Sequence, residues 1–377
     1  MKSLSVHFLG WLYRNFGTKI FFMFDSEPIH DFVLNMGDIM GKIPGVPALT
    51  GLFIKVSDSS LNTEVAGIHF ENPVGMSAGF DHEARLTQII SGLGIGFESI
   101  GTVTNKPYAG NAYPRIKRLV KSKSLLVNKG FKSTGMEKVL SRLSGYKFRV
   151  PVGISIGRTN TVEHNDHADA ITDIIESFKK AEASKVPFSY FELNISCPNL
   201  SKDISFYEPE RLHQLLSAIF LLELSKPLFI KMPTTLSDEK TKHLLDVVMK
   251  FPVAAVILGN LQHDRNNPAF DKGEIAEFGK YKGNWSGMPC QSRSDELIRL
   301  AYTHTEGKLP IIGCGGIFNA EDAYRKIKLG SSLVQLATGF VFNGPQLAGE
   351  ICADLPEMLK KDGFKNIKEA VGAGTLL

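Results

Sequence analysis

The sequence predicts an α/β fold: a (β/α)8 barrel of parallel strands and connecting helices, preceded by an N-terminal helical extension. From about residue 65, short apolar runs alternate with helical patterns, and the runs end in polar or glycine-rich residues. Strands that alternate with helices form a parallel sheet with right-handed crossovers, and eight such units close into a barrel. A doubly wound open sheet is the alternative. No GxGxxG turn follows the first strand, which argues against the dinucleotide-binding version of that sheet.

The expected strands are apolar runs that stop at or before a glycine, a proline or a polar residue. They cover residues 73–79, 99–104, 150–157, 190–196, 228–232, 254–259, 310–316 and 333–339. Helical patterns lie between most of them, at residues 169–183, 209–224, 238–250, 295–303 and 320–328. We therefore expect one barrel domain over residues 51–377 and a helical extension over residues 1–50.

The composition is that of a globular protein, with 377 residues, 43% hydrophobic and 22% charged. A net charge of +4 gives no indication of nucleic-acid binding, although it is compatible with an anionic substrate or membrane surface. The four cysteines show no CxxC spacing, so we expect neither a disulfide framework nor a zinc site, and a reducing cytoplasm is favoured. No run of eighteen apolar residues indicates a membrane span.

The first 24 residues form a basic, aromatic-rich segment. Lys2, Arg14 and Lys19 are interspersed with apolar and aromatic side chains, and no acidic residue precedes Asp25. Such a helix is suited to a membrane interface, with its aromatic side chains in the headgroup layer. A helix docked on its own domain is an equally good interpretation, and the sequence leaves both open.

A second helix is expected to begin at Ser26, a capping residue, with Pro28 in its first turn. The helical pattern continues towards Gly41. Pro44 and Pro47 then mark a linker to the barrel.

The fourth expected strand ends in the most distinctive polar cluster of the chain, Asn194-Ile-Ser-Cys-Pro-Asn199. Because Pro198 cannot continue a central strand, the cluster lies where the strand ends, at the edge that carries barrel active sites. Cys197 is therefore a candidate reactive thiol flanked by hydrogen-bonding amides. The alternative is a buried, small apolar Cys197 with amides that only cap the loop, since free cysteines are often simply buried.

The seventh and eighth strands end in glycine-containing segments, at residues 313–317 (GCGGI) and 337–340 (ATGF). Glycine permits close backbone approach and leaves N–H groups free to face a phosphate. Loops after these two strands are a recurrent phosphate site in barrels. The pair predicts a phosphate-bearing cofactor.

Other strand ends add polar side chains to the same rim. Lys231 requires a partner, either the anionic edge of a reduced flavin or a salt bridge in the barrel mouth. Asn260 adds an amide, and Thr102 adds a hydroxyl. His82 follows small residues beside which a flat ring could lie, and it is either a substrate ligand or structural. This set lacks a carboxylate pair or a metal-ligand cluster, and it suits hydride transfer on a bound flavin.

These residues resemble the dihydroorotate dehydrogenases, FMN enzymes of pyrimidine synthesis built on a TIM barrel. The similarity covers nearly the whole chain. Residues 24–32 (FDSEPIHDF) resemble the helical extension through which the membrane-associated class of the family admits quinone. The other matching motifs are residues 72–81 (NPVGMSAGFD), 100–104 (IGTVT), 194–199 (NISCPN), 285–287 (WSG), 309–317 (LPIIGCGGI) and 333–336 (LVQL).

The resemblance implies oxidation of dihydroorotate to orotate, with Cys197 taking the C5 proton, FMN accepting hydride from C6, and quinone as electron acceptor. It also implies a peripheral protein on the cytoplasmic side of the membrane that contacts lipid through residues 1–24. The oligomeric state is left open with a monomer favoured, and no nucleic-acid partner is expected. FMN would contact Ala78, Gly79, Thr102, Ser155, Asn194, Lys231, Gly259, Gly287, Gly316, Ala337 and Thr338, and the substrate would contact His82, Asn128, Asn194, Asn199 and Asn260.

The departures from the family pattern are concentrated at the substrate. Cys197 stands where the quinone class usually has serine, although the cytosolic class of the family uses cysteine there. Two alternatives follow: an FMN barrel oxidoreductase for another small cyclic substrate, or a flavin-binding paralogue with little activity. The other departures are His82 for a lysine, Val127 for an amide that Asn128 or Lys129 could replace, Leu200 for a hydroxyl and Ala337 for an aromatic residue.

Overall fold

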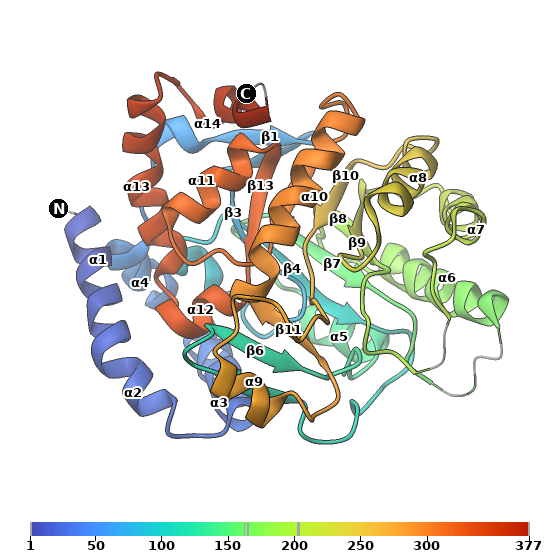
Figure 1. The fold of residues 1–377 in the computed structure, drawn as a ribbon, viewed down its shortest axis with the longest axis horizontal. Helices are drawn as coiled ribbons and strands as arrows, with labels where there is room; N and C mark the ends of the chain where they lie inside the picture. The colour runs from blue at the N-terminus through green and yellow to red at the C-terminus, as the bar shows by residue number, and fades with distance from the viewer. Residues whose placement is uncertain (1, 162, 164–165, 202–203, 376–377) are drawn as a thin grey trace.

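The computed structural model describes residues 2–161, 163, 166–201 and 204–375. Within these residues, eight parallel strands close into a barrel, each paired with the next and the last with the first (Figure 1). The predicted (β/α)8 barrel is therefore confirmed. Its strands are β3 (Val74–Met76), β4 (Phe97–Val103), β7 (Val152–Ile156), β8 (Tyr190–Asn194), β9 (Leu228–Met232), β10 (Ala255–Leu258), β12 (Ile311–Cys314) and β13 (Ser331–Leu336).

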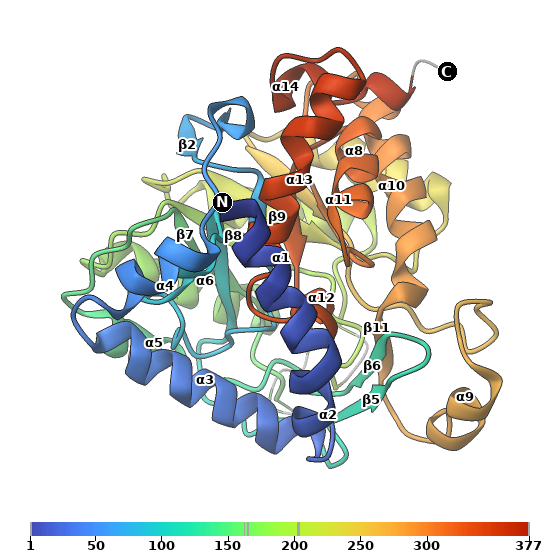
Figure 2. The same ribbon diagram turned by 90° about the vertical axis from the view of Figure 1, so that its left-hand side faces the viewer.

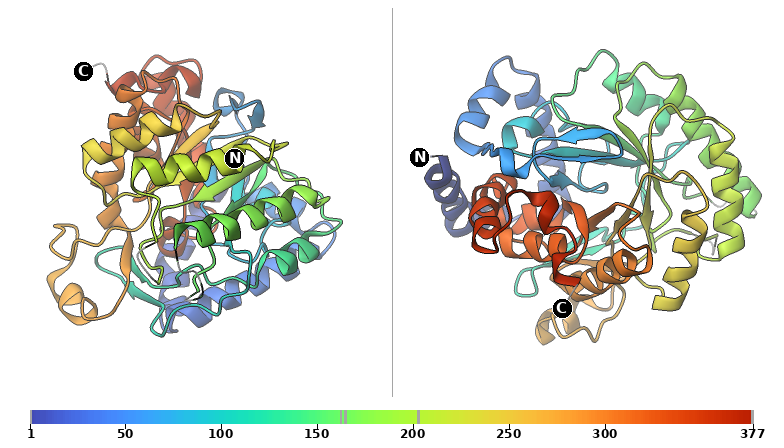
Figure 3. Two further views of the ribbon diagram at one scale, coloured as in Figure 1. Left: turned by 90° about the vertical axis from the view of Figure 1, so that its right-hand side faces the viewer. Right: turned by 90° about the horizontal axis from the view of Figure 1, so that it is seen from above.

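Helices surround the strands and bury an apolar layer against their outer face (Figure 3). All five helical patterns expected between strands correspond to helices of the structure. The outer helices are α5 (Met136–Leu143), α6 (His167–Ala183), α7 (Pro209–Phe220), α8 (Asp238–Val248), α10 (Gln291–His304), α11 (Ala320–Lys328), α12 (Thr338–Asn343), α13 (Leu347–Lys361) and α14 (Ile367–Ala370).

The inside of the barrel is filled by large side chains from several strands, neighbouring strands included. Tyr190 stacks on Phe229 with ring centroids 4.5 Å apart. Phe70 packs against Phe97 at 5.2 Å, and Phe70 belongs to a hairpin of β1 (Thr63–Val65) and β2 (Ile68–Phe70). These buried rings make the barrel a packed core rather than a pore, so ligands are confined to its ends.

A small antiparallel sheet, which the sequence did not predict, lies at the opposite end of the barrel from β1 (Figure 1). Its strands are β5 (Ile116–Leu119) and β6 (Ser124–Val127), from the segment after β4, and β11 (Asn284–Gly287), from the segment after β10. The short helix α9 (Lys272–Phe278) precedes β11. This sheet covers the carboxyl ends of the barrel strands, which is where the sequence places its polar residues.

The N-terminal segment is helical and one of its helices begins at Ser26, both as expected, but a further helix occupies the predicted linker and continues past residue 50. It comprises α1 (Lys2–Leu12), a π-helical turn, α2 (Thr18–Phe21), α3 (Ser26–Lys42) and α4 (Val46–Ile54) (Figure 2). Asp25, not Ser26, is the N-cap of α3. Pro44 lies in the turn between α3 and α4, but Pro47 belongs to α4, where a residue without an N–H group is tolerated in the first turn.

The N-terminal helices pack against the barrel, and they also expose many apolar side chains to solvent. Helix α1 contacts α13, and Arg14 beyond it pairs with Glu350 of α13 at 2.8 Å. In the part of the chain that the structure describes, no helix combines the length and apolar character that a bilayer crossing needs. The exposed apolar side chains include Leu4, Phe8, Trp11, Phe16, Ile20, Met23, Phe24, Phe32, Ile39, Leu49, Leu52 and Phe53.

A buried ion pair joins α3 to the barrel. Both Glu27 and Arg115 have side chains that are 7% exposed, and Arg115 Nη2 lies 2.8 Å from Glu27 Oε1. Arg115 Nε also donates to Glu27 Oε2 at 3.1 Å. Because the two charges are desolvated together, removal of one leaves the other buried without compensation.

We predict that Glu27→Ala lowers the free energy of unfolding by about 3 kcal/mol, the usual scale for breaking a buried pair. Urea denaturation of the full chain measures this change. Asp38→Ala is the matched control on the same helix, because Asp38 pairs with Lys42 at an exposed i,i+4 position. The control should cost less than about 0.5 kcal/mol, and equal losses in the two variants would contradict the assignment.

Candidate active site

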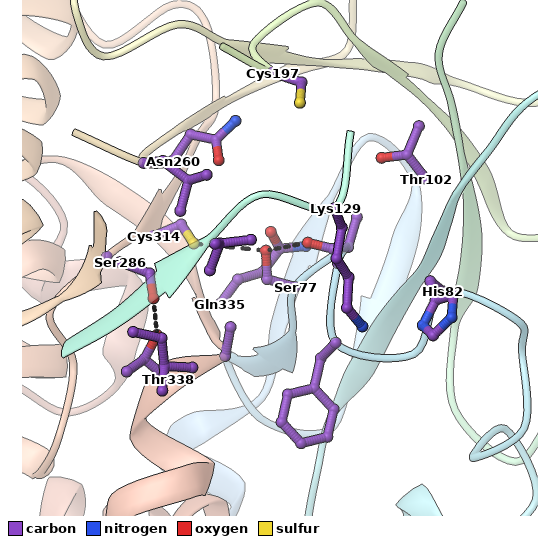
Figure 4. A pocket seen from close by; sticks show the side chains of 18 of the residues that line it. Ser77, His82, Thr102, Lys129, Cys197, Asn260, Ser286, Cys314, Gln335 and Thr338 are labelled. Atoms are coloured by element: carbon purple, nitrogen blue, oxygen red, sulfur yellow. Dashed lines mark hydrogen bonds between the residues drawn. The ribbon is translucent and has the colours of Figure 1, made fainter. Parts of the chain in front are cut away.

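One cavity lies at the carboxyl ends of the barrel strands and is also lined by residues of the antiparallel sheet (Figure 4). It contains about 1250 Å³ of empty space, its open mouth included. Residues from seven of the eight barrel strand ends meet around it, so distant parts of the sequence converge there. The predicted site residues that line it are Ala78, Gly79, His82, Thr102, Asn194, Cys197, Asn199, Lys231, Asn260, Gly287, Gly316, Ala337 and Thr338.

Two residues predicted at the cofactor do not line this cavity. Ser155 lies one layer behind the wall, where its hydroxyl donates to Glu192 at 2.7 Å and is 3.0 Å from Thr102 Oγ1. Gly259 faces β12, and a Cβ atom there would overlap the carbonyl oxygen of Cys314. Ser155 therefore supports Thr102, and Gly259 allows two neighbouring strands to approach closely.

The segment after β6 places its residues differently from the prediction. Asn128, expected at the substrate, lies outside the cavity wall, and its side-chain oxygen accepts a hydrogen bond from Asn111 at 3.0 Å. Val127 and Lys129 line the cavity instead. Leu200 lines a separate small cavity on the other side of Cys197.

Glycines shape one part of the wall. Gly315 and Gly316 have φ angles of +104° and +69°, a left-handed backbone that favours glycine. At Gly79, with a φ angle of +105°, no atom lies within 4 Å of the position that a Cβ would take. Nearby, Thr338 Oγ1 donates to Ser286 Oγ at 2.7 Å (Figure 4). The wall thus leaves room for a flat group beside Gly79, and it presents backbone and hydroxyl groups at its glycine-rich end.

Lys231 is held at the base of the cavity. Its side chain is buried, and its Nζ donates to Ser77 Oγ at 2.8 Å. Cys314, also on the wall, lies 3.6 Å from the same hydroxyl. The acceptors of Lys231 Nζ that the structure shows are Ser77 Oγ and, at 3.4 Å, the carbonyl oxygen of Ala78, both uncharged, and Lys231 lines the cavity.

The amides around the cavity are oriented by the residues after β8. Asn194 Nδ2 donates to Thr102 Oγ1 at 2.7 Å, while its Oδ1 accepts from the backbone N–H of Ser196 at 3.1 Å. Asn260 Nδ2 donates to the carbonyl oxygen of Ser196 at 3.1 Å. Asn199 Nδ2 donates to the carbonyl oxygen of Val127 at 2.9 Å. Ser196, which sequence reasoning did not single out, is therefore the residue that fixes two of the three amides.

Cys197 lies on the loop after β8, and its thiol is at the opposite side of the pocket from Thr338 (Figure 4). Burial raises the pKa of the Cys197 thiol to about 11, although a backbone hydrogen bond from Asn199 and the charges of Arg158 and Lys231 lower it. The side chain is partly exposed to the cavity. At neutral pH the group is a protonated thiol that can exchange its proton with a bound molecule.

Two basic side chains, Lys129 and His82, lie beside each other in the pocket (Figure 4), and the His82 ring lies 6.1 Å from that of His30 of α3. Burial lowers the pKa of Lys129 to about 8, against the opposing effect of Asp31 and Glu27. Burial also lowers the pKa of His82 well below its usual value, and the charge of Lys129 adds to that effect. At neutral pH the lysine is therefore mostly charged, and the histidine is neutral.

A second, apolar cavity lies beneath the N-terminal helices and holds about 1500 Å³ of empty space. Apolar side chains of α3, including Val33, Met36 and Met40, line it. It adjoins the first cavity through shared wall residues, which are His30, Phe80, Ile116, Leu125 and Val341.

Comparison of the sequence and structure with known proteins identifies the family of this chain. The family model described as dihydroorotate dehydrogenase matches residues 60–359. The chain belongs to the dihydroorotate dehydrogenase family. The match spans every strand of the barrel, so the cavity at its carboxyl-terminal rim is the candidate active site of a family oxidoreductase.

Similar proteins extend the match beyond the barrel. The dihydroorotate dehydrogenase (quinone) of Christiangramia forsetii is 36% identical over 344 residues, which cover 90% of this chain and 97% of that protein. The protein of the same name from Haloarcula marismortui is 34% identical, over 84% of this chain and 87% of its own. The ligand-free DHODH structure from Eimeria tenella superposes with a TM-score of 0.81 at 27% identity, and the match covers 93% of this chain and 99% of that one.

Proposed function

We propose that this chain is a quinone-dependent dihydroorotate dehydrogenase, which oxidises dihydroorotate to orotate in pyrimidine synthesis. One observation carries the proposal: a family barrel surrounds a single cavity with a thiol, three amides and a lysine, and this cavity shares a wall with an apolar one. The similar protein from Christiangramia forsetii, named dihydroorotate dehydrogenase (quinone), covers 90% of this chain, which supports quinone as the acceptor.

The residues of the cavity fit FMN. Gly79 leaves room for a flat ring, Gly316 and Thr338 offer backbone and hydroxyl groups for a phosphate, and Lys231 brings a positive charge. FMN held there would supply the acceptor for a hydride from the substrate and the donor of electrons to quinone. Lys231, held by Ser77, stabilises negative charge on the reduced ring. Ala78, Thr102, Asn194, Gly287 and Ala337 complete the proposed cofactor wall.

The proposed roles of the remaining residues follow from their positions. Cys197 takes the C5 proton, while Asn194, Asn199 and Asn260 bind the amide groups of the substrate ring. Because the pKa of Cys197 is about 11, only a small fraction of the enzyme carries the thiolate at neutral pH. The charges of Arg158 and Lys231 favour that thiolate.

The N-terminal helices supply the proposed quinone port. The apolar cavity beneath α3 suits a hydrophobic quinone, and its shared wall brings such a ligand next to the candidate active site. The exposed aromatic side chains of residues 1–24, Phe8, Trp11 and Phe16 among them, support peripheral contact with the cytoplasmic face of a membrane. Residues 1–50 then act as the extension and residues 51–377 as the FMN barrel, although residue 50 lies inside α4.

A second candidate function rests on two cavity residues. Val127 offers no amide, and His82 is buried and neutral where the family resemblance implies a lysine. These side chains favour an FMN barrel oxidoreductase that acts on a different small cyclic substrate. The two functions differ in whether dihydroorotate reduces the bound flavin.

We therefore predict that the purified protein is yellow and that anaerobic dihydroorotate bleaches its absorbance near 450 nm, roughly the flavin maximum. Addition of a quinone should restore the absorbance. Release of FMN on denaturation, identified by chromatography, checks the cofactor independently. A yellow protein that dihydroorotate does not bleach would refute the dihydroorotate dehydrogenase activity and favour the oxidoreductase for a different cyclic substrate.

We predict that Cys197→Ala slows flavin reduction by roughly 10²- to 10⁴-fold, the scale of a lost general base. In the wild type, at saturating substrate, the rate should rise about tenfold per pH unit between pH 6 and 9. The reason is that the thiolate fraction grows in that proportion below a pKa of about 11. Stopped-flow absorbance measures both effects.

The matched control is Cys314→Ala, which removes the other thiol on the same wall. It should change the reduction rate less than tenfold and keep the wild-type pH dependence. A Cys197→Ala enzyme that reduces its flavin at the normal rate would refute the role of Cys197 as base.

For the quinone port, we predict that Met36→Trp raises the KM for quinone roughly tenfold, because the larger indole takes space that the ligand needs and steric crowding in an apolar site costs about 1–3 kcal/mol. Flavin reduction by dihydroorotate should stay unchanged in stopped-flow measurements. Ile39→Trp is the control, since Ile39 is exposed on the same helix but does not line the apolar cavity. Equal effects of the two variants on quinone, or a loss of flavin reduction in Met36→Trp, would contradict the port.

A further inference from the structure

A buried lysine on the wall of the active-site cavity has no partner. Lys129 is 9% exposed, and among the described residues its Nζ has no hydrogen-bond acceptor. In Figure 4 its side chain lies within the pocket, with its nitrogen towards His82. A buried ammonium without a partner is costly, so such a group marks a place where a ligand supplies the missing negative charge.

The other lysines that line the cavity in the described part of the chain are already engaged. Lys231 donates to Ser77 Oγ at 2.8 Å. Lys132 lies 3.6 Å from Glu27 Oε1. Lys129 is therefore the lysine of this cavity that has no protein partner among the described residues, whereas Lys231, held by Ser77, faces the proposed flavin.

His82 cannot provide a positive charge at the same place. It is 5% exposed, and its Nδ1 has no hydrogen-bond partner among the described residues. Protonation there would add a second charge next to that of Lys129, and this repulsion together with burial keeps the pKa of His82 well below its usual value. The positive charge on this wall is therefore that of Lys129, and His82 contributes a neutral imidazole ring.

The position of Lys129 indicates which anion it meets. The glycine-rich end of the cavity, with Thr338 and Ser286, lies on the other side of the pocket from Lys129 and His82 (Figure 4). A phosphate held at that end is therefore remote from Lys129. The segment that carries Lys129 contacts an amide proposed to hold a small ring, because Asn199 Nδ2 donates to the carbonyl oxygen of Val127 at 2.9 Å. The anion facing Lys129 therefore belongs to that ring.

We propose that Lys129 binds the carboxylate of the substrate and thereby makes the enzyme select an anionic cyclic amide over a neutral one. This assignment rests on the proposed function and adds to it a specificity-determining residue. A direct contact between the ammonium and the carboxylate replaces water that Lys129 lost on burial, so the pair is stronger than an exposed ion pair.

The test is equilibrium binding of orotate to the oxidised holoenzyme, followed through the change in the flavin spectrum. Lys129→Met keeps the length of the side chain without its charge, and it should weaken orotate binding roughly 10- to 100-fold, the scale of a hydrogen bond to a charged group. Binding of uracil, the same ring without the carboxylate, should change less than about threefold. The control is Lys132→Met, on the same wall but paired with Glu27, which should leave both affinities within about threefold.

The pH dependence provides a second readout. Because the pKa of Lys129 is about 8, wild-type affinity for orotate should fall as the pH rises from 7 to 9, and this fall should be absent in Lys129→Met. The charged and titratable groups that face Lys129 are Asp31 and Glu27 of α3, Arg115 before β5, Lys132 of its own segment, and the rings of His30 and His82.

The outcomes separate this assignment from the proposed function. If wild-type enzyme binds orotate and Lys129→Met binds it equally well, or loses uracil to the same degree, the role of Lys129 is overturned and the function stands. A wild-type holoenzyme that fails to bind orotate overturns both.

Discussion

The closure of the parallel barrel is the constraint on which the rest of the structure depends. Pairing of β13 with β3 joins the last strand to the first, so every strand is hydrogen-bonded on both sides and all carboxyl ends lie on one rim. Contacts across the rim follow from this closure. Lys231 reaches Ser77, 154 residues away in sequence, and Asn194 reaches Thr102, 92 residues away. An open sheet would leave these side chains apart, and the cavity would not form.

The sequence predicted the barrel strands well because buried parallel strands are apolar on both faces and end abruptly. The bounds of β9 match the prediction at both ends. The antiparallel sheet was missed because its strands are short and pair over long distances, as when Asn284 meets Val127. Helix α4 was missed for a different reason: Pro47 is compatible both with a linker and with the first turn of a helix, and only packing decides between them.

Most residues predicted from the barrel strand ends line the cavity, whereas in the segment after β6 the residue on the wall differs by one position from the predicted one. Successive residues of an extended segment point to opposite sides, so a shift of one position exchanges the wall with the layer behind it. Asn128 and Lys129 follow β6 directly, and the sequence favoured the amide, whereas the structure places the lysine on the wall. Ser155 also lies behind the cavity wall instead of on it, because its hydroxyl contacts Thr102 Oγ1. Burial and partner geometry, which a sequence does not specify, decided these positions.

The N-terminal helices line the apolar cavity together with the barrel, and their charged side chains also act on titratable groups of the active-site cavity. Helix α3 brings Glu27 and Asp31 towards the cavity, and pairing with His30 lowers the pKa of Asp31 to about 2, so Asp31 stays ionised. The negative charges of these two side chains raise the pKa of Lys129 against the larger effect of burial. Without the charges of Glu27 and Asp31, burial and the neighbouring Lys132 and Arg115 would act on Lys129 unopposed, and its charge would be lost at lower pH. The helix that lines the proposed quinone port therefore also maintains the cation on the substrate side, which couples the extension to both ligands of the proposed reaction.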